Sequence, residues 1–291
     1  MIRRLTTAVA ALALTVPLAA ALPAGAAPPD GKGPGERPDT SSRSVQWYLA
    51  LGDSLAAGYQ PTTGDDLDGG YVGHVLEGVQ EDYAKTRLVN LACSGETSAE
   101  MIDGGDCSYD QGSQLAAAEQ FLRAHKDKVS TVTIHIGAND VAGCVYDAVP
   151  FDPQDVPAAI ELDTCLRRGL AAFDQNLDTI LTRLRAASPS TDIVIGNYYN
   201  PFLAGAVLPP LRDLAPRTIP YAAALNNGIT VNAEESGAEV ADVAAAFDND
   251  TPGLNVSAIC TNTWMCQRLD IHANNLGYAL IGDAFMAVLA E

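Results

Sequence analysis

The sequence has few basic residues and few long apolar runs, and both shortages limit what the protein can be. Only 17 Lys and Arg stand against 36 Asp and Glu, which gives a formal net charge of -19, and the basic residues form no cluster. This balance disfavours nucleic acid and anionic membrane surfaces as partners. After residue 27 no apolar run is long enough to cross a bilayer, so we expect no stable membrane insertion.

The one long apolar run lies at the N-terminus. Arg3 and Arg4 precede an apolar run from Leu5 to Leu22, and small residues at 24–26 suit a cleavage site. This order is typical of a secretory signal peptide, which we predict over residues 1–26. A membrane anchor is the alternative, and the prolines within and after the run disfavour it. We therefore expect a secreted, extracellular protein.

The segment after the predicted signal peptide has almost nothing apolar to bury. Residues 27–44 are rich in proline, glycine, serine and charge, which predicts a disordered leader. Residues 45–291 are long enough for one domain with a full core, and we expect a monomer.

Metal-binding patterns are also missing. No Cys-x-x-Cys pair occurs, and the four histidines are scattered without a His-Glu-x-x-His spacing, so we expect no metal and no cofactor. Six cysteines in an exported chain predict disulfides instead, although the sequence alone allows many connectivities. Our hypothesis is neighbour pairing, which closes three loops without crossing the core: Cys93–Cys107, Cys144–Cys165 and Cys260–Cys266.

Short apolar runs alternate with helical patterns along the domain. This alternation predicts an α/β fold, with a mainly parallel five-stranded sheet covered by helices on both faces as a three-layer sandwich. Helices are expected at 71–83 and 162–186, and a last helix carries an apolar stripe from Leu276 to Val288. The expected strands are 47–51, 88–92, 132–136, 193–195 and 240–243.

Polar residues follow the predicted strands, at the edge where doubly wound sheets bind ligands. The first strand runs into Gly52-Asp53-Ser54-Leu55, and small helix formers after it predict a helix start whose N–H groups favour an oxyanion. The other segments are 90–97 after the second strand, 137–140 after the third, and 270–272 before the last helix.

These four segments, in this order, resemble the four blocks of the SGNH, or GDSL, hydrolases, and in particular secreted actinobacterial lipases and esterases. The resemblance spans nearly all of the domain and implies a flavodoxin-like fold. It implies that Ser54 is the nucleophile and His272 the general base. The oxyanion hole would consist of the Ser54 and Gly95 backbone N–H groups and the Asn139 amide. Glycine suits its position because a side chain would block the substrate oxygen.

Each of these residue types also has a structural interpretation. Helix caps, turns and core histidines use the same residues, and a single match would favour that interpretation. The joint occurrence at successive strand ends favours catalysis instead. We interpret Asp53 and Asp140 as turn-bracing residues, and His135 and His74 as packing residues.

The sequence departs from the family pattern at one position. The family has an aspartate three residues before the histidine, where this chain has Leu269. Asp270 lies two residues before His272 and, in extended chain, would point to the same face. The orienting group is therefore Asp270 or, alternatively, the Leu269 backbone carbonyl in a Ser-His dyad, and we favour Asp270.

The resemblance implies a serine carboxylic-ester hydrolase, a lipase or esterase, whose substrate is an acyl ester, either a lipid or another small ester. A phospholipase and a polysaccharide O-deacetylase are alternatives within the fold, and a non-catalytic binding module is one from another class. An α/β-hydrolase lipase is disfavoured because Ser54 lies in no Gly-x-Ser-x-Gly elbow.

Two segments are expected to be long irregular loops that wall the pocket, residues 141–165 and 248–268. Apolar residues near strand ends would line an acyl channel, with ordinary loop packing as the alternative. They are Val141, Val145, Val149, Phe151, Phe202, Leu203, Leu208, Trp264 and Met265.

Overall fold

The structure is a computed structural model that describes residues 45–149, 151–251 and 253–290. The predicted signal peptide at 1–26 and the predicted leader at 27–44 lie outside the described residues. Among the residues that the structure describes, every helix is too short or too polar to span a bilayer.

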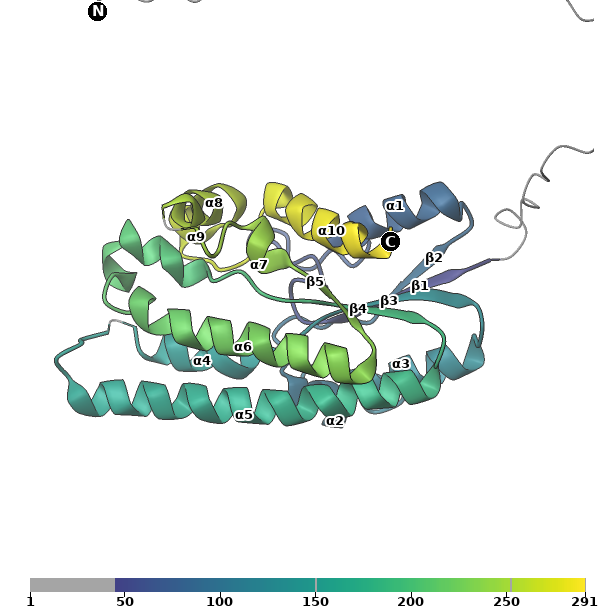
Figure 1. Ribbon diagram of the computed structural model, residues 1–291, viewed down its shortest axis with the longest axis horizontal. Coiled ribbons are helices and arrows are strands. Elements are labelled where there is room, and N and C mark those ends of the chain that lie inside the picture. The colour runs from purple at the N-terminus through teal and green to yellow at the C-terminus, as the bar shows by residue number, and fades with distance from the viewer. Residues whose placement is uncertain (1–44, 150, 252, 291) are drawn as a thin grey trace, which may run out of the picture. The chain divides into compact units, whose positions relative to one another are not determined.

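A parallel five-stranded sheet forms the centre of the domain, in the order β2-β1-β3-β4-β5 (Figure 1). The α/β prediction is confirmed. The β1, β3 and β4 strands are almost entirely buried because helices cover both faces, as parallel sheets require. The strands are β1 (Trp47–Gly52), β2 (Arg87–Asn90), β3 (Val129–His135), β4 (Asp192–Gly196) and β5 (Glu239–Ala241).

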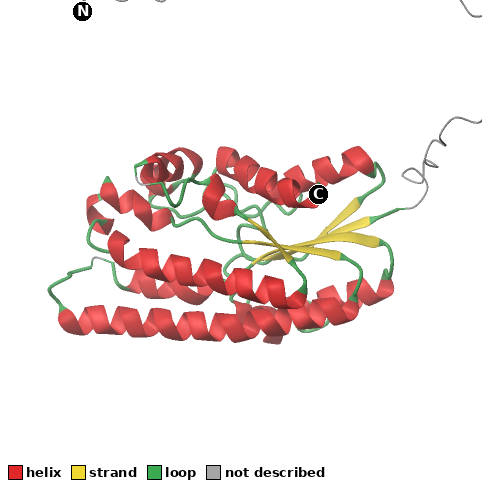
Figure 2. Ribbon diagram, in the orientation of Figure 1, coloured by secondary structure: helices red, strands yellow, loops and turns green. Residues whose placement is uncertain are grey.

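Helices form one layer on each side of the sheet (Figures 1 and 2). The α1 (Gly70–Asp82) and α10 (Asn275–Leu289) helices lie on one face, and α3 (Gln114–Ala124), α5 (Val156–Ala187) and α6 (Ala215–Ser236) lie on the other. The shorter helices are α2 (Ser98–Asp103), α4 (Asn139–Asp147), η1 (Pro201–Ala206), η2 (Pro209–Leu211), α7 (Val243–Ala246), α8 (Leu254–Asn262) and α9 (Met265–Arg268).

The long helix α5 shows how the apolar pattern sets the packing. Phe173, Leu177 and Leu184 recur at helical spacing and are fully buried, so one stripe of the helix faces the sheet. The helix begins at Val156, six residues before its predicted start. The Asp155 side chain accepts a hydrogen bond from a backbone N–H of the first turn, which adds a cap that the apolar pattern does not show.

Two local expectations are wrong, and one helix was not expected at all. No helix follows Ser54: residues 54–58 form successive turns, and the next helix begins at Gly70. The expected irregular loops at 141–165 and 248–268 are largely helical and contain most of α4, the start of α5, and the α8 and α9 helices. The 22-residue helix α6 has no counterpart in the sequence prediction, since Pro216, Pro220 and Gly228 are poor helix formers.

The strand order reverses direction between β1 and β3. The chain leaves β1 to form β2 on one side and later returns to form β3 on the other, and such a switch point opens a crevice at the carboxyl ends. The two strands meet closely at Gly52, whose φ is 137°, and an added Cβ would lie 2.1 Å from the His135 carbonyl oxygen. Only glycine fits there.

Three disulfides connect the cysteines as neighbours along the chain. Cys93–Cys107 closes the segment that contains α2, Cys144–Cys165 joins α4 to α5, and Cys260–Cys266 joins α8 to α9. The described residues contain no free cysteine. Two of the three disulfides therefore hold together the helices that replace the expected loops.

Candidate active site

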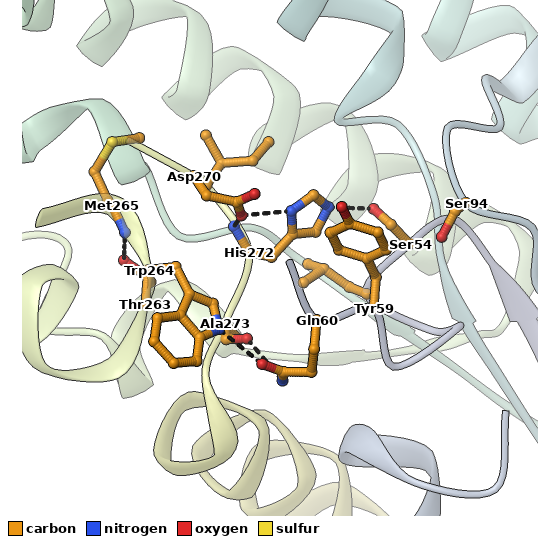
Figure 3. A network of polar contacts seen from close by, with 12 residues as sticks. Ser54, Tyr59, Gln60, Ser94, Thr263, Trp264, Met265, Asp270, His272 and Ala273 are labelled. Atoms are coloured by element: carbon orange, nitrogen blue, oxygen red, sulfur yellow. Dashed lines mark hydrogen bonds and ion pairs between the residues drawn. The ribbon is translucent and has the colours of Figure 1, made fainter. Parts of the chain in front are cut away.

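Three side chains form a continuous hydrogen-bonded chain at the carboxyl edge of the sheet (Figure 3). The Ser54 Oγ lies 2.8 Å from the His272 Nε2, and the His272 Nδ1 lies 2.7 Å from the Asp270 Oδ1. An ionised carboxylate only accepts, so the His272 Nδ1 donates to it and leaves Nε2 to accept the Ser54 hydroxyl proton. The imidazole therefore has the tautomer that a general base needs.

Local backbone geometry explains how an acid at this position reaches the ring. Leu269 ends α9 with a left-handed φ of 56°, and its side chain is exposed. The chain then turns so that the Asp270 Oδ1 accepts the His272 backbone N–H at 2.9 Å as well as the ring N–H. Burial disfavours the charged carboxylate, but these hydrogen bonds outweigh it and the pKa of Asp270 is lowered. Asp270 is thus a charged partner of the ring.

Tyr59 and Gln60 follow the turns at residues 54–58 and contact His272 and its neighbours (Figure 3). The Tyr59 ring lies 4.5 Å from the His272 ring, centroid to centroid. The Gln60 Oε1 accepts the Trp264 indole N–H at 2.7 Å, while the Gln60 Nε2 donates to the Ala273 carbonyl. Sequence reasoning missed Tyr59 and Gln60, because nothing in the chain shows that they reach residues more than 200 positions away.

Gly95 and Asn139 are the other two residues that the sequence predicts for the oxyanion hole. Gly95 has a left-handed φ of 86°, and apart from its chain neighbours an added Cβ would meet no atom of the described residues within 4 Å. Asn139 is the first residue of α4 and lines the cavity beside Ser54. Its Nδ2 donates one hydrogen to the Glu96 carbonyl at 2.9 Å, which leaves the second amide hydrogen for a substrate oxygen.

Asp53 stabilises the start of the turns at residues 54–58. Its side chain is buried and accepts hydrogen bonds from the Leu55 backbone N–H at 2.9 Å and from the Tyr198 hydroxyl at 2.6 Å. Burial raises the pKa of Asp53 to about 6, and the two hydrogen bonds partly oppose that shift. Asp140 has a similar place at α4, where it accepts from the backbone N–H and the hydroxyl of Ser98.

Two histidines have partners of their own. His135 is buried in β3, with its Nε2 3.1 Å from the Asn197 carbonyl, and burial lowers its pKa to about 4. His74 on α1 pairs with Asp283 on α10 at 2.8 Å. Neither lines the cavity beside Ser54.

A largely apolar cavity begins at Ser54, Asn139 and His272 and extends between α4, α5 and α6. Two of its polar side chains bond to each other, since the Asn200 Nδ2 donates to the Thr218 Oγ1 at 2.9 Å. The Thr218 hydroxyl in turn donates to the Ala215 carbonyl at 2.8 Å. The apolar lining includes Val141, Ala142, Val145, Leu166, Phe202, Tyr221, Ala222, Leu225 and Ile271.

Only part of this lining was expected. Val141, Val145 and Phe202 line the cavity, whereas the other six expected residues do not. Phe151 lines a separate cavity beside the Cys144–Cys165 disulfide, and Met265 is buried in the core. The part of the cavity wall that the sequence did not predict comes from α6. The residues absent from the cavity are Val149, Phe151, Leu203, Leu208, Trp264 and Met265.

The fold and this site define a class of protein. A doubly wound parallel sheet with a Ser-His-Asp hydrogen-bonded chain at its switch point is the arrangement of a serine hydrolase. The GDSL-like lipase/acylhydrolase family model matches residues 50–280, and the chain belongs to that family. It is a carboxylic-ester hydrolase, in agreement with the predicted enzyme class.

Solved structures share the fold at low sequence identity. Phospholipase A1 from Streptomyces albidoflavus is 19% identical, with a TM-score of 0.55 over 85% of this chain and 99% of that one. An extracellular lipase from Streptomyces rimosus is 18% identical, with a TM-score of 0.53 over 84% and 98%. A mutant acetyl-xylooligosaccharide esterase from Geobacillus is 19% identical, with a TM-score of 0.51 over 84% and 94%. No curated protein sequence matches the chain.

Proposed function

We propose that the protein is a secreted serine esterase or lipase that cleaves acyl esters through an acyl-enzyme on Ser54. The observation that carries the proposal is the unbroken hydrogen-bonded chain from Ser54 through His272 to Asp270. In this proposal His272 is the general base, and Asp270 holds its ring and stabilises the imidazolium. The alternative acceptor, the Leu269 carbonyl, would supply no negative charge.

The proposed reaction has two symmetrical steps. The His272 Nε2 takes the Ser54 proton while Oγ bonds to the ester carbonyl carbon, and the resulting oxyanion accepts hydrogen bonds from the Ser54 and Gly95 N–H groups and from Asn139. The imidazolium then gives its proton to the leaving alcohol oxygen as the ester bond breaks. Water repeats the sequence on the acyl-enzyme, which releases the carboxylic acid and restores Ser54.

The cavity suggests which half of the ester it holds. The alcohol leaves first and water must replace it beside His272, so the alcohol side needs access to solvent. The acyl chain stays attached to Ser54 and gains from burial, at about 0.8 kcal/mol per CH₂ group. The apolar lining therefore favours a lipid acyl ester over the acetyl group of a polysaccharide, and a phospholipid remains a substrate of the same kind.

Labelling by a fluorophosphonate probe tests the nucleophile. We expect an adduct on Ser54 in the wild-type chain, identified by peptide mass spectrometry, and no adduct and no esterase activity in Ser54→Ala. A wild-type chain without an adduct would reject the enzyme proposal and favour a binding module.

A series of p-nitrophenyl esters tests the acyl assignment. We expect Ala222→Phe to lower kcat/KM for octanoate at least about tenfold relative to acetate, because the ring fills the cavity lining. Ala224→Phe is the matched control, since Ala224 is exposed on the same helix and does not line the cavity. Equal losses for acetate and octanoate would contradict the assignment.

Export is the remaining part of the proposal. The predicted signal peptide at residues 1–26 supports it, and three disulfides suit an oxidising compartment. N-terminal sequencing of protein recovered from the medium should begin at Ala27. Retention of the activity inside cells with an intact N-terminus would contradict secretion.

A further inference from the structure

A buried glutamine holds the end of the strand that carries the nucleophile. Gln114, the first residue of α3, is fully buried. Its Oε1 accepts the Gly52 backbone N–H at 2.6 Å, and its Nε2 donates to the Gly52 carbonyl at 3.0 Å. One side chain thus satisfies both backbone groups two residues before Ser54, and the two contacts fix the orientation of its amide.

The same glutamine also contacts the loop that carries Gly95. The Gln114 Nε2 donates to the Glu96 Oε2 at 2.9 Å, and the Glu96 side chain is only 4% exposed. Glu96 follows Gly95, and its backbone carbonyl accepts the Asn139 amide at 2.9 Å. A single path of hydrogen bonds therefore runs from Gly52 through Gln114 and Glu96 to Asn139.

The surroundings of Glu96 do not support a charged carboxylate. Its Oε1 has no hydrogen-bond partner among the described residues, and the charged neighbours that act on it, Glu100 and Asp53, are acids. The nearby Tyr109 hydroxyl donates to the Leu91 carbonyl. Burial raises the pKa of Glu96 to about 7, although the hydrogen bond from Gln114 opposes that shift. A buried acid without a cation and without a step in the reaction needs another explanation.

We propose that Glu96 and Gln114 form a positioning pair that holds the oxyanion donors of Gly95 and Asn139 at a fixed place relative to Ser54. The inference rests on the proposed function, because it needs an oxyanion to form there. The Glu96 carbonyl occupies one Asn139 hydrogen and so directs the other toward the cavity. The Gln114 bridge keeps the loop from shifting away from the nucleophile turn.

A displaced donor weakens transition-state stabilisation more than substrate binding. An error of about 1 Å in a catalytic position costs up to roughly a hundredfold in rate. Removing the Glu96 carboxyl group, which accepts the hydrogen bond from Gln114, should therefore lower kcat and leave KM nearly unchanged. A side chain that served stability alone would lower the melting temperature without this split.

Four variants test the pair with p-nitrophenyl butyrate. We expect Glu96→Ala and the similarly sized Glu96→Met to lower kcat roughly ten- to hundredfold, with KM changed less than about threefold. Glu96→Gln should keep kcat within about threefold, since its amide oxygen can accept from Gln114. Glu100→Ala is the structural control: it removes the hydrogen bonds that the Glu100 carboxylate accepts from the Thr97 backbone N–H and hydroxyl, and it should leave kcat unchanged.

The outcomes separate the inference from the function beneath it. Activity in Ser54→Ala would reject the proposed function itself. If Ser54→Ala is inactive but Glu96→Met keeps wild-type kcat, the positioning pair is wrong. Equal kcat losses in Glu96→Met and Glu96→Gln would also overturn it, as would a Glu100→Ala loss of the same size. Glu96→Met preserves buried volume, so it decides the matter if Glu96→Ala fails to fold.

Discussion

The two sides of the proposed active site, the base side with His272 and the oxyanion side with Asn139, are built in different ways. On the base side, Asp270 and His272 are neighbours in the sequence, both are partly exposed, and one carboxylate oxygen contacts both the ring and the backbone of the same histidine. On the oxyanion side, Gln114 and Glu96 are buried, and the hydrogen bonds to Gly52 and Asn139 join residues 62 and 43 positions apart.

The difference shows how each side obtains its precision. A local turn can orient an imidazole because two residues cannot move far from each other along the chain. An oxyanion hole collects donors from separate loops, so its geometry depends on buried contacts that fix those loops together. Substitutions on the base side should therefore lower activity by removing charge and tautomer control. Those on the oxyanion side should lower it by removing donors or displacing the backbone.

Loss of the Asp270 charge should have the largest effect. We expect Asp270→Asn to lower kcat by several orders of magnitude, near the roughly ten-thousand-fold loss seen when a serine protease loses tautomer control. Asp283→Asn is the matched control, because it alters a second His-Asp pair, with His74, outside the cavity. Steady-state kinetics measures both. A loss below about tenfold would favour a backbone carbonyl as the orienting group.

Removal of the Asn139 amide should have the next largest effect. One side-chain donor in an oxyanion hole contributes about 100- to 1000-fold in kcat. Asn139→Ala should therefore lower kcat by that factor with little change in KM, and fluorophosphonate labelling of Ser54 should also slow. Nearly unchanged activity would remove Asn139 from the oxyanion hole and leave the backbone donors alone.

A methyl group at Gly95 should have a smaller effect and tests the backbone donor. The added Cβ meets no protein atom, so Gly95→Ala should fold with a strain of about 1 kcal/mol from its left-handed φ. We expect kcat to fall about tenfold, because the methyl group crowds the substrate oxygen. Gly52→Ala is the contrasting variant and should not fold, since its Cβ would overlap the His135 carbonyl. Unchanged kcat in Gly95→Ala would argue against Gly95 as a donor.

The smallest expected effect is on how the stability of the folded chain depends on pH. The pKa of Glu96 is about 7 in the folded chain, against an ordinary value of 4.5. The folded state thus keeps a proton that the unfolded chain loses, and this stabilisation is complete below the lower value and is lost as pH rises through the higher one. The melting temperature should fall less between about pH 5 and about pH 8 in Glu96→Gln than in the wild type.

Exposed Glu77→Gln is the control for that measurement and should keep the wild-type slope. Asp53, whose pKa is also raised, adds a slope of the same sign that both variants retain. Identical slopes in all three proteins would show that Glu96 does not hold its proton on folding.

Local patterns explain why much of the fold was predictable. Apolar runs of strand length and the stripe on α5 identify elements that packing then buries, and all five predicted strands are present. The α6 helix was missed because its stability comes from packing against α5 and the sheet rather than from its own residues, which include an internal Pro220. Without α6, the cavity wall at Tyr221, Ala222 and Leu225 could not be foreseen.

The sequence by itself determined the five strands, the helices with a clear apolar stripe and the polar residues that follow the strands, because all of these depend on short-range pattern. It left open whether Asp270 or the Leu269 carbonyl faces the histidine, since a left-handed turn decides that. Only the tertiary structure brought Gln114 to Gly52 and Glu96, and α6 to the cavity beside Ser54. These contacts join distant parts of the chain, and their energies depend on burial that no local pattern records.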